Sequence, residues 1–217
     1  VCVYLSQHKN QLVNEELWNE ATTYRDVQLM PFVDYYSLIT LKTIAICIFG
    51  TQVVSSMYIM KTDDDAFVRI DEILNSLTKT GVTRGLLYGL INSDSQPHRD
   101  TGSKWYISPE EWPDEKYPPW ANGPGYVVSN DIAAMVSKQH KRGRLKIFKL
   151  EDVAMGMWIA DMKRRKKGVE VRYEKDERIV SEGCKDGYVV AHYQTPRELL
   201  CLWQKLEEKN RPECCGD

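Results

Sequence analysis

The sequence has no marked excess of either charge, and this absence limits the kinds of partner it can bind. Its 217 residues contain 29 Lys and Arg against 31 Asp and Glu, a formal net charge of −2 at pH 7. A nucleic-acid-binding domain usually presents a clearly basic face, so we expect no nucleic-acid partner. The one basic run, 163–167, is interpreted as the end of a helix, where cations complement the helix dipole.

The sequence also lacks an apolar stretch suited to crossing a membrane. A spanning helix needs about 20 predominantly apolar residues, and the longest mostly apolar stretch, 39–60, is interrupted by Lys42, Gly50 and a pair of serines. No signal peptide is present, and the chain opens at Val1 in a strand-like run. We therefore expect an excised piece of a longer protein, with any membrane anchor in the missing N-terminal part.

Cysteines at the CxxC spacing of thiolate zinc sites are absent as well. The six cysteines allow up to three disulfides and fifteen complete pairings, among which the sequence does not choose. Cys47 lies in an apolar helical run and is expected to be a buried thiol. The remaining cysteines near the C-terminus could be joined to one another in an oxidising compartment; they are Cys184, Cys201, Cys214 and Cys215.

Apolar periodicity predicts a single α/β domain over residues 1–217. The predicted strands are 1–5, 27–33, 57–60, 85–91, 126–129, 169–173 and 188–192, and the predicted helices are 14–24, 37–54, 70–77, 130–140, 152–165 and 196–208. Because strands and helices alternate, we expect a mixed, mostly parallel sheet flanked by helices. The stretch 92–125 is rich in Pro, Gly, Ser, Asp and Trp, as is typical of a functional loop.

Three adjacent carboxylates, Asp63, Asp64 and Asp65, directly follow the predicted strand 57–60. Ligands of open α/β sheets bind just beyond the carboxyl ends of strands, and a bound cation would relieve the repulsion among the carboxylates. Oxygen ligands suit magnesium or manganese, and Asp63 and Asp65, two positions apart, make the expected pair. The alternative is an acidic turn before the helix that begins near Arg69.

Two further positions carry candidate chemistry. Glu151 and Asp152 enter the predicted helix 152–165, where either could be a general base or could simply complement the helix dipole. His192 ends the predicted strand 188–192, where a neutral imidazole could bind the same metal, although a histidine buried in the core is the alternative.

Gly123 and Gly125 flank a proline just before a predicted strand, which would let the backbone approach a ligand closely. Nearby aromatic residues offer flat apolar faces of the kind on which sugars stack: Trp105, Tyr106, Trp112, Tyr117, Trp120 and Tyr126. A rigid connection with partly buried aromatics explains the same pattern.

Taken together, these motifs resemble glycosyltransferase family 31, the β-1,3-galactosyltransferase group, and especially plant members whose full-length forms carry a galectin-like domain. The segments that carry the resemblance are 60–68, 117–129, 150–156 and 191–194, and the resemblance covers essentially the whole chain. It implies a GT-A-type nucleotide-sugar transferase fold. Family domains begin with an earlier strand, so the resemblance also implies a catalytic domain whose N-terminal strand is missing.

The resemblance implies an inverting, metal-dependent transfer of galactose from UDP-galactose. Asp63, Asp64 and Asp65 would form the metal and nucleotide motif, with Asp65 and His192 as Mn²⁺ ligands and Asp63 near the ribose or a metal-bound water.

For the remaining site residues, the resemblance implies that Asp152 is the base, with Glu151 as the second choice. Gly123 and Gly125 would lie against the donor sugar.

The acceptor implied by the resemblance is a glycan or glycoprotein, with N-acetylglucosamine at the end of N-glycans favoured. The alternatives are hydroxyproline of arabinogalactan proteins and a non-catalytic sugar-binding or chaperone relative on the same fold. A calcium-binding module is excluded, because the spaced ligand loop of an EF-hand is absent. The parent would be a single-pass type II membrane protein of the Golgi lumen.

Overall fold

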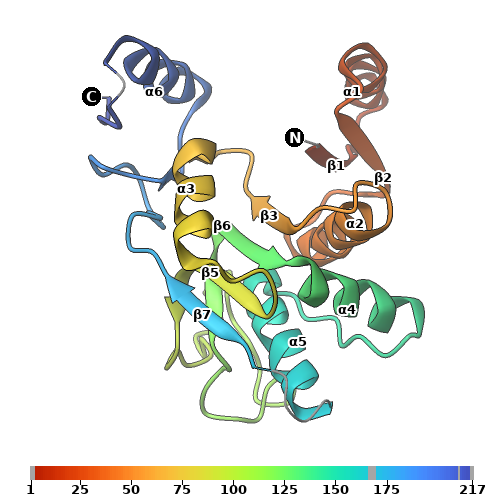
Figure 1. The fold of residues 1–217 in the computed structure, drawn as a ribbon. Coiled ribbons are helices and arrows are strands. Elements are labelled where there is room, and N and C mark those ends of the chain that lie inside the picture. The colour runs from red at the N-terminus through yellow and green to blue at the C-terminus, as the bar shows by residue number, and fades with distance from the viewer. Residues whose placement is uncertain (1–2, 166–169, 210, 216–217) are drawn as a thin grey trace.

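The computed structural model describes residues 3–165, 170–209 and 211–215 (Figure 1). In chain order the elements are β1 (Val3–Gln7), α1 (Gln11–Tyr24), β2 (Val27–Val33), a 3₁₀ turn (Tyr36–Leu38), α2 (Ile39–Gln52), β3 (Tyr58–Thr62), β4 (Phe67–Val68), α3 (Ile70–Thr80), β5 (Leu86–Asn92), β6 (Trp120–Ser129), α4 (Asn130–Lys141), α5 (Glu151–Arg165), β7 (Arg172–Lys175), β8 (Val190–Ala191) and α6 (Pro196–Lys209). Every predicted helix is present, whereas the last predicted strand shrinks to β8. Residues 166 and 167 of the basic run lie outside the described residues.

The prediction of a mostly parallel sheet was wrong. The main sheet has the order β3-β6-β5-β7, in which β6 runs antiparallel to both of its neighbours and only β5 and β7 are parallel. Parallel neighbours need a crossover connection, usually a helix. Residues 93–119 form no helix, so the chain that leaves β5 returns beside it in the opposite direction.

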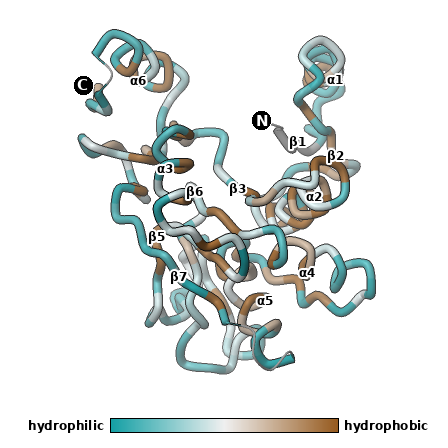
Figure 2. The backbone as a smooth tube through the Cα atoms, viewed as in Figure 1, coloured by the Kyte–Doolittle hydropathy of each residue, from teal (hydrophilic) through white to brown (hydrophobic). Residues whose placement is uncertain are grey.

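Helices cover both faces of this sheet, and the alternation of side chains along the strands separates two cores. Leu87 and Val128 point to the face covered by α2, α4 and α5, whereas Tyr88 and Val127 point to the face covered by α3. Figure 2 shows hydrophobic segments concentrated in α2 and the sheet. None of the helices in the described ranges is long and apolar enough to span a membrane.

A second pairing, between β4 and β8, joins distant parts of the chain. Phe67 pairs with Ala191 and Val68 with Val190, in antiparallel register. The turn that precedes β4 contains the three aspartates, and His192 directly follows β8. This short ladder therefore decides which histidine lies beside the acidic motif.

Two disulfides close the C-terminal region. They join Cys184 to Cys214 and Cys201 to Cys215, with Cα atoms 5.8 and 6.3 Å apart. The expected cross-linking of this region is confirmed, and so is the buried free thiol at Cys47. Cys2 lies outside the described residues.

Close contact between α5 and the start of β6 depends on Gly156. A Cβ atom at this position would lie 2.6 Å from the carbonyl oxygen of Pro119 and 2.8 Å from the Cβ of Trp120. The helix can therefore approach the strand only where it has no side chain. This contact fixes the distance between β6 and the first turn of α5, which carries Glu151 and Asp152.

Gly156→Ala is expected to destabilise the protein. Overpacking costs about 1–3 kcal/mol, which exceeds the roughly 1 kcal/mol that alanine gains over glycine in a helix. Urea unfolding measures the difference. Gly102→Ala is the matched control, because the nearest atoms to its added Cβ are 3.4 Å away in the side chain of Asp100. Equal stability of the two variants would contradict the packing role.

Candidate functional site

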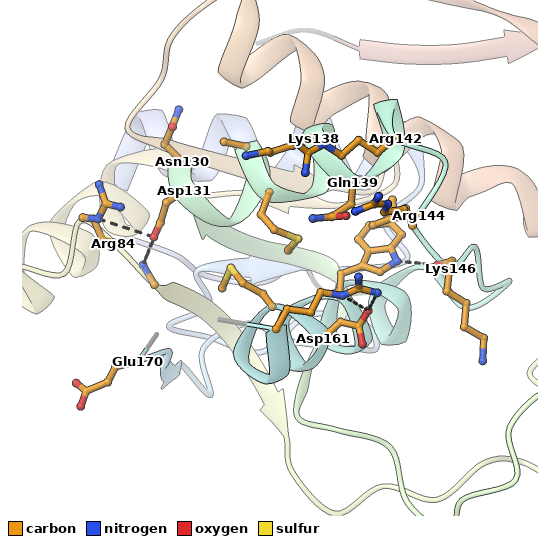
Figure 3. Close-up of a pocket in the computed structure, with 17 residues that line it drawn as sticks. Arg84, Asn130, Asp131, Lys138, Gln139, Arg142, Arg144, Lys146, Asp161 and Glu170 are labelled. Atoms are coloured by element: carbon orange, nitrogen blue, oxygen red, sulfur yellow. Dashed lines mark hydrogen bonds and ion pairs between the residues drawn. The ribbon is translucent and has the colours of Figure 1, made fainter. Parts of the chain in front are cut away.

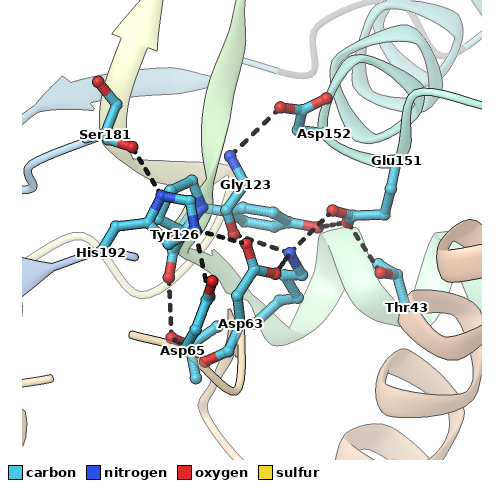
Figure 4. Close-up of polar contacts among 12 residues, drawn as sticks. Thr43, Asp63, Asp65, Gly123, Tyr126, Glu151, Asp152, Ser181 and His192 are labelled. Atoms are coloured by element: carbon cyan, nitrogen blue, oxygen red, sulfur yellow. Dashed lines mark hydrogen bonds and ion pairs between the residues drawn. The ribbon is translucent and has the colours of Figure 1, made fainter. Parts of the chain in front are cut away.

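Asp63, Asp65 and His192 form one group at the end of β3 (Figure 4). The Nε2 atom of His192 lies 3.5 Å from Oδ2 of Asp63 and 3.3 Å from Oδ1 of Asp65. One potential ligand atom from each residue lies within 4.8 Å of the others. Asp64, the middle aspartate, is exposed and lies outside this group.

The orientation of the His192 ring bears on what this group can bind. Its Nδ1 lies 2.6 Å from the carbonyl oxygen of Ser181, and a carbonyl can only accept, so Nδ1–H is the donor. Nε2 then faces the two carboxylates with a lone pair, an arrangement that is repulsive unless a proton or a cation lies between them. Two carboxylates and an imidazole held by a backbone carbonyl suit a divalent cation such as Mn²⁺.

Lys61 connects this group to the rest of the site. Its side chain is buried, and its ammonium donates to Oδ1 of Asp63 and, at 2.8 Å, to the carbonyl oxygen of Gly123. The ammonium also lies 3.2 Å from Oε2 of Glu151. Burial by itself would lower the pKa of Lys61, but the negative charges of Glu151 and Asp63 raise it above its usual value, so the ammonium stays charged.

Glu151 is a buried anion held on several sides. Besides Lys61, its carboxylate accepts hydrogen bonds from the hydroxyl of Thr43, at 2.8 Å, and from the hydroxyl of Tyr126. Burial and the nearby Glu151 charge raise the pKa of Tyr126 well above its usual value, so this hydroxyl keeps its proton and remains a donor. The carboxylate of Glu151 is thus committed to contacts inside the protein.

Asp152, one residue along the helix, has different surroundings. Its Oδ2 accepts from the backbone N–H of Gly123 at 3.2 Å, and its Oδ1 accepts from the N–H of Val153 at 2.8 Å. Part of the residue reaches solvent, although protein atoms crowd the carboxyl group. This desolvation, followed by the charge of Glu151, raises the pKa of Asp152 to about 7. A carboxyl group with that pKa can accept a proton near neutral pH.

The two glycines of the 117–126 segment have different environments. Gly123 lies between the two halves of the site, because its carbonyl accepts from Lys61 and its N–H donates to Asp152. Gly125 packs against the core, where an added Cβ would lie 3.0 Å from Val190 and 3.2 Å from Met60. Glycine at position 125 therefore allows this close packing.

Most of the aromatic side chains that the sequence offered for sugar stacking are packed against other parts of the protein. Trp112 and Tyr117 pack on each other and on Phe148, with ring centroids 5.5 to 6.2 Å apart. The indole N–H of Trp120 donates to Ser95. Tyr126 is buried under the site and Tyr106 is half-buried, so Trp105, with 37% of its surface exposed, is the member of this set that presents the most surface to solvent.

Sequence reasoning missed Lys61 and Tyr36. A signal for Lys61 exists, since a lysine within an apolar strand, two residues before Asp63, points to the same side as that aspartate. Tyr36 carried no comparable signal. Partial burial, followed by the negative charge of Asp152, raises the pKa of Tyr36.

A separate cavity of about 680 Å³ lies between α4 and α5 (Figure 3). Its lining includes Lys138, Arg142 and Arg144 and shares no residue with the group around Asp63. The carboxylates of Asp63 and Asp65, the imidazole of His192 and the carboxyl group of Asp152, whose pKa is raised, all lie outside this cavity. We therefore assign the chemistry to the group at the end of β3.

These features define an α/β protein in which a candidate divalent-metal group and a carboxyl group of raised pKa meet at one end of a sheet. A family model described as galactosyltransferase matches residues 3–169. The chain belongs to this family, glycosyltransferase family 31.

Curated relatives agree with this assignment. Beta-1,3-galactosyltransferase GALT1 of Arabidopsis thaliana is 68% identical over 99% of this chain and 33% of its own length. Hydroxyproline O-galactosyltransferase GALT5 of the same plant is 44% identical over 98% of this chain and 31% of its own length. Beta-1,3-galactosyltransferase 5 of Mus musculus is 32% identical over 90% of the chain and 64% of its own length. The chain thus spans about a third of the length of its plant relatives.

Lys61→Met is expected to lower the free energy of unfolding by about 3–5 kcal/mol, because it leaves buried Glu151 without its counter-charge. The double variant Lys61→Met, Glu151→Gln should recover part of this loss. Lys116→Met is the control, since its ion pair with Asp94 is exposed on both sides and should contribute little to stability. Urea denaturation measures the free energy of unfolding of the three variants. A loss in Lys61→Met no larger than that in the control would refute the stabilising contact between Lys61 and Glu151.

Proposed function

We propose that residues 1–217 belong to the catalytic domain, of GT-A type, of an inverting, Mn²⁺-dependent β-1,3-galactosyltransferase that uses UDP-galactose. The observation that carries the proposal is the juxtaposition of the Asp63–Asp65–His192 group with Asp152 across the backbone of Gly123, in a member of the galactosyltransferase family.

The proposed metal ligands are Asp63, Asp65 and His192. A bound Mn²⁺ would offset the charge that builds on the departing UDP. Ser181 fixes the imidazole so that Nε2 faces the ligand group, and Lys61 holds one carboxylate oxygen of Asp63. Asp64, which is exposed, is proposed to lie at the nucleotide and not at the metal.

The proposed base is Asp152. Its carboxylate would take the proton of the acceptor hydroxyl while the acceptor oxygen bonds to C1 of galactose. The bond from C1 to the β-phosphate oxygen breaks on the opposite face, and its electron pair leaves with UDP. Asp152 is preferred to Glu151, because the carboxylate of Glu151 is already bound by Lys61, Thr43 and Tyr126.

The backbone of Gly123 lies beside the carboxyl group of Asp152, which supports its proposed position against the donor sugar. Gly125 is proposed to act more indirectly, by allowing β6 to pack closely beside Val190.

The proposed acceptor is terminal N-acetylglucosamine of N-glycans. Support comes from the 68% identity to a protein named as a β-1,3-galactosyltransferase, against 44% and 42% to proteins named as hydroxyproline O-galactosyltransferases. Transfer to hydroxyproline is the second candidate because of those two relatives. A sugar-binding relative without activity is disfavoured, because the ligand group and the carboxyl group of raised pKa are both in place.

The deciding experiment measures galactose transfer by the full-length protein with Mn²⁺ or EDTA, offering a GlcNAc-terminated N-glycan and a hydroxyproline peptide. Mn²⁺-dependent transfer to the N-glycan alone supports the first candidate, and transfer to the peptide alone supports the second. UDP binding without transfer to either would favour the non-catalytic relative.

We further propose that the protein works in the Golgi lumen as part of a single-pass type II membrane protein. The two C-terminal disulfides suit an oxidising compartment. Protease protection of the tagged full-length protein in intact Golgi vesicles tests this location, and digestion without detergent would contradict it.

Asp65→Ala is expected to abolish the Mn²⁺ dependence of UDP binding, because it removes one carboxylate from the ligand group. Isothermal titration of UDP with and without Mn²⁺ provides the measurement. Asp64→Ala is the control, since this exposed residue lies outside the group and its loss should leave the metal dependence intact. If Asp65→Ala still showed the wild-type Mn²⁺ effect, Asp65 would not be a ligand.

Asp152→Asn is expected to lower kcat by about 10²-fold or more while UDP still binds, as the loss of a general base does. The wild-type kcat/KM should rise as pH increases through about 7, because the base acts only after its carboxyl group has lost the proton. Glu151→Gln is the comparison, expected to reduce stability and to keep a rise of kcat/KM with pH. Turnover near the wild-type level in Asp152→Asn would move the base elsewhere.

A further inference from the structure

The positive charges described so far at the site do not balance the negative charge of the carboxylates and the departing nucleotide. Four carboxylates gather there, from Asp63, Asp65, Glu151 and Asp152, and Lys61 is the buried ammonium among them. A divalent metal adds two positive charges, whereas a nucleoside-diphosphate sugar brings about two negative ones, and its diphosphate gains another as the bond to the sugar breaks. Preorganised cations at the place where charge develops are a main source of transition-state stabilisation.

Lys104 is a cation that lies close to the proposed metal group and, within the described residues, pairs with no carboxylate. Its ammonium lies 4.6 Å from the ring centroid of Trp105 and 5.9 Å from that of Tyr193. The Tyr193 ring in turn stacks on the imidazole of His192, with centroids 3.9 Å apart and planes 25° from parallel. Within the described residues, the ammonium of Lys104 makes no ion pair, and it lies one aromatic ring away from a proposed metal ligand.

Tyr193, whose ring contacts Lys104, has a strained backbone conformation. Tyr193 has φ of +56°, a left-handed conformation that is costly for a bulky residue. The next residue, Gln194, fixes it: its backbone N–H donates to the carbonyl of Asp65 at 2.9 Å, and its side-chain amide donates to the carbonyl of His192 at 2.8 Å. The ring that supports Lys104 is therefore tied to the same turn that carries the ligand group.

Trp105 belongs to the same loop tip as Lys104 and, with 37% of its surface exposed, faces solvent more than the other aromatic residues of this loop. The Tyr193 ring contacts both the ammonium of Lys104 and the imidazole of His192. A nucleotide-sugar bound at the Asp63–Asp65–His192 group would therefore lie beside this tip.

We propose that Lys104 binds the β-phosphate of the nucleotide and stabilises the leaving diphosphate, an inference that rests on the proposed function. As the bond from C1 to the phosphate oxygen breaks, the electron pair stays on that oxygen, and an N–H of Lys104 donates to the phosphate. The ammonium keeps its proton throughout. Trp105 and Tyr193 hold the ammonium by cation–π contact, which leaves its N–H groups free of competing carboxylates.

The test compares UDP with UMP, which differ by the β-phosphate. Titration of the full-length protein in Mn²⁺ should show that Lys104→Met weakens UDP binding by about 10- to 100-fold, the range expected for one hydrogen bond to a charged group. UMP affinity should stay within about twofold. Lys104→Arg should keep most of the UDP affinity, because the guanidinium retains the charge.

Lys146→Met is the matched control, since its ammonium lies 5.4 Å over the ring of Trp112 and its residue belongs to the separate cavity. It should change neither affinity. Equal losses for UDP and UMP in Lys104→Met would mean that Lys104 merely shapes the loop, and unchanged UDP affinity would likewise overturn the inference. Absence of Mn²⁺-dependent UDP binding by the wild-type protein would instead overturn the proposed function itself.

Discussion

The buried ammonium of Lys61 is the interaction on which the rest of the site depends. It joins Asp63 on the turn after β3, Gly123 on β6 and Glu151 on α5. An ion in this position costs several kcal/mol to desolvate, and only close oxygen partners offset that cost. The three elements must therefore meet in one arrangement, which also sets where Asp152 lies relative to the Asp63 carboxylate.

The long connection 93–119 shapes the site in three ways. Because it contains no helix, β6 returns antiparallel between β3 and β5, and so brings Gly123 and Tyr126 beside Lys61 and Glu151. Its aromatic residues Trp112 and Tyr117 pack with Phe148 in a small core, which keeps a long irregular segment folded. Its tip is then free to present Lys104 and Trp105 near the proposed metal group.

Much of the candidate site could be predicted because its signals are local. The three aspartates follow an apolar strand, and Asp152 opens an amphipathic helix, so both positions can be read from short windows of sequence. The direction of the strands could not be read in this way, because alternating elements favour a parallel sheet unless one connection lacks its helix. Lys61 was overlooked, since a single lysine in a strand looks like a solvated side chain until its burial is known.

The sequence by itself determined the family, the helices and the residue types available for chemistry, because periodicity and motifs act over a few neighbouring residues. Only the tertiary structure decided how those residues divide the work. Glu151 and Asp152 are neighbours on one helix, yet the first is enclosed by Lys61, Thr43 and Tyr126 while the second reaches solvent beside Gly123. That difference arises from contacts between segments far apart in the chain, which no local pattern encodes.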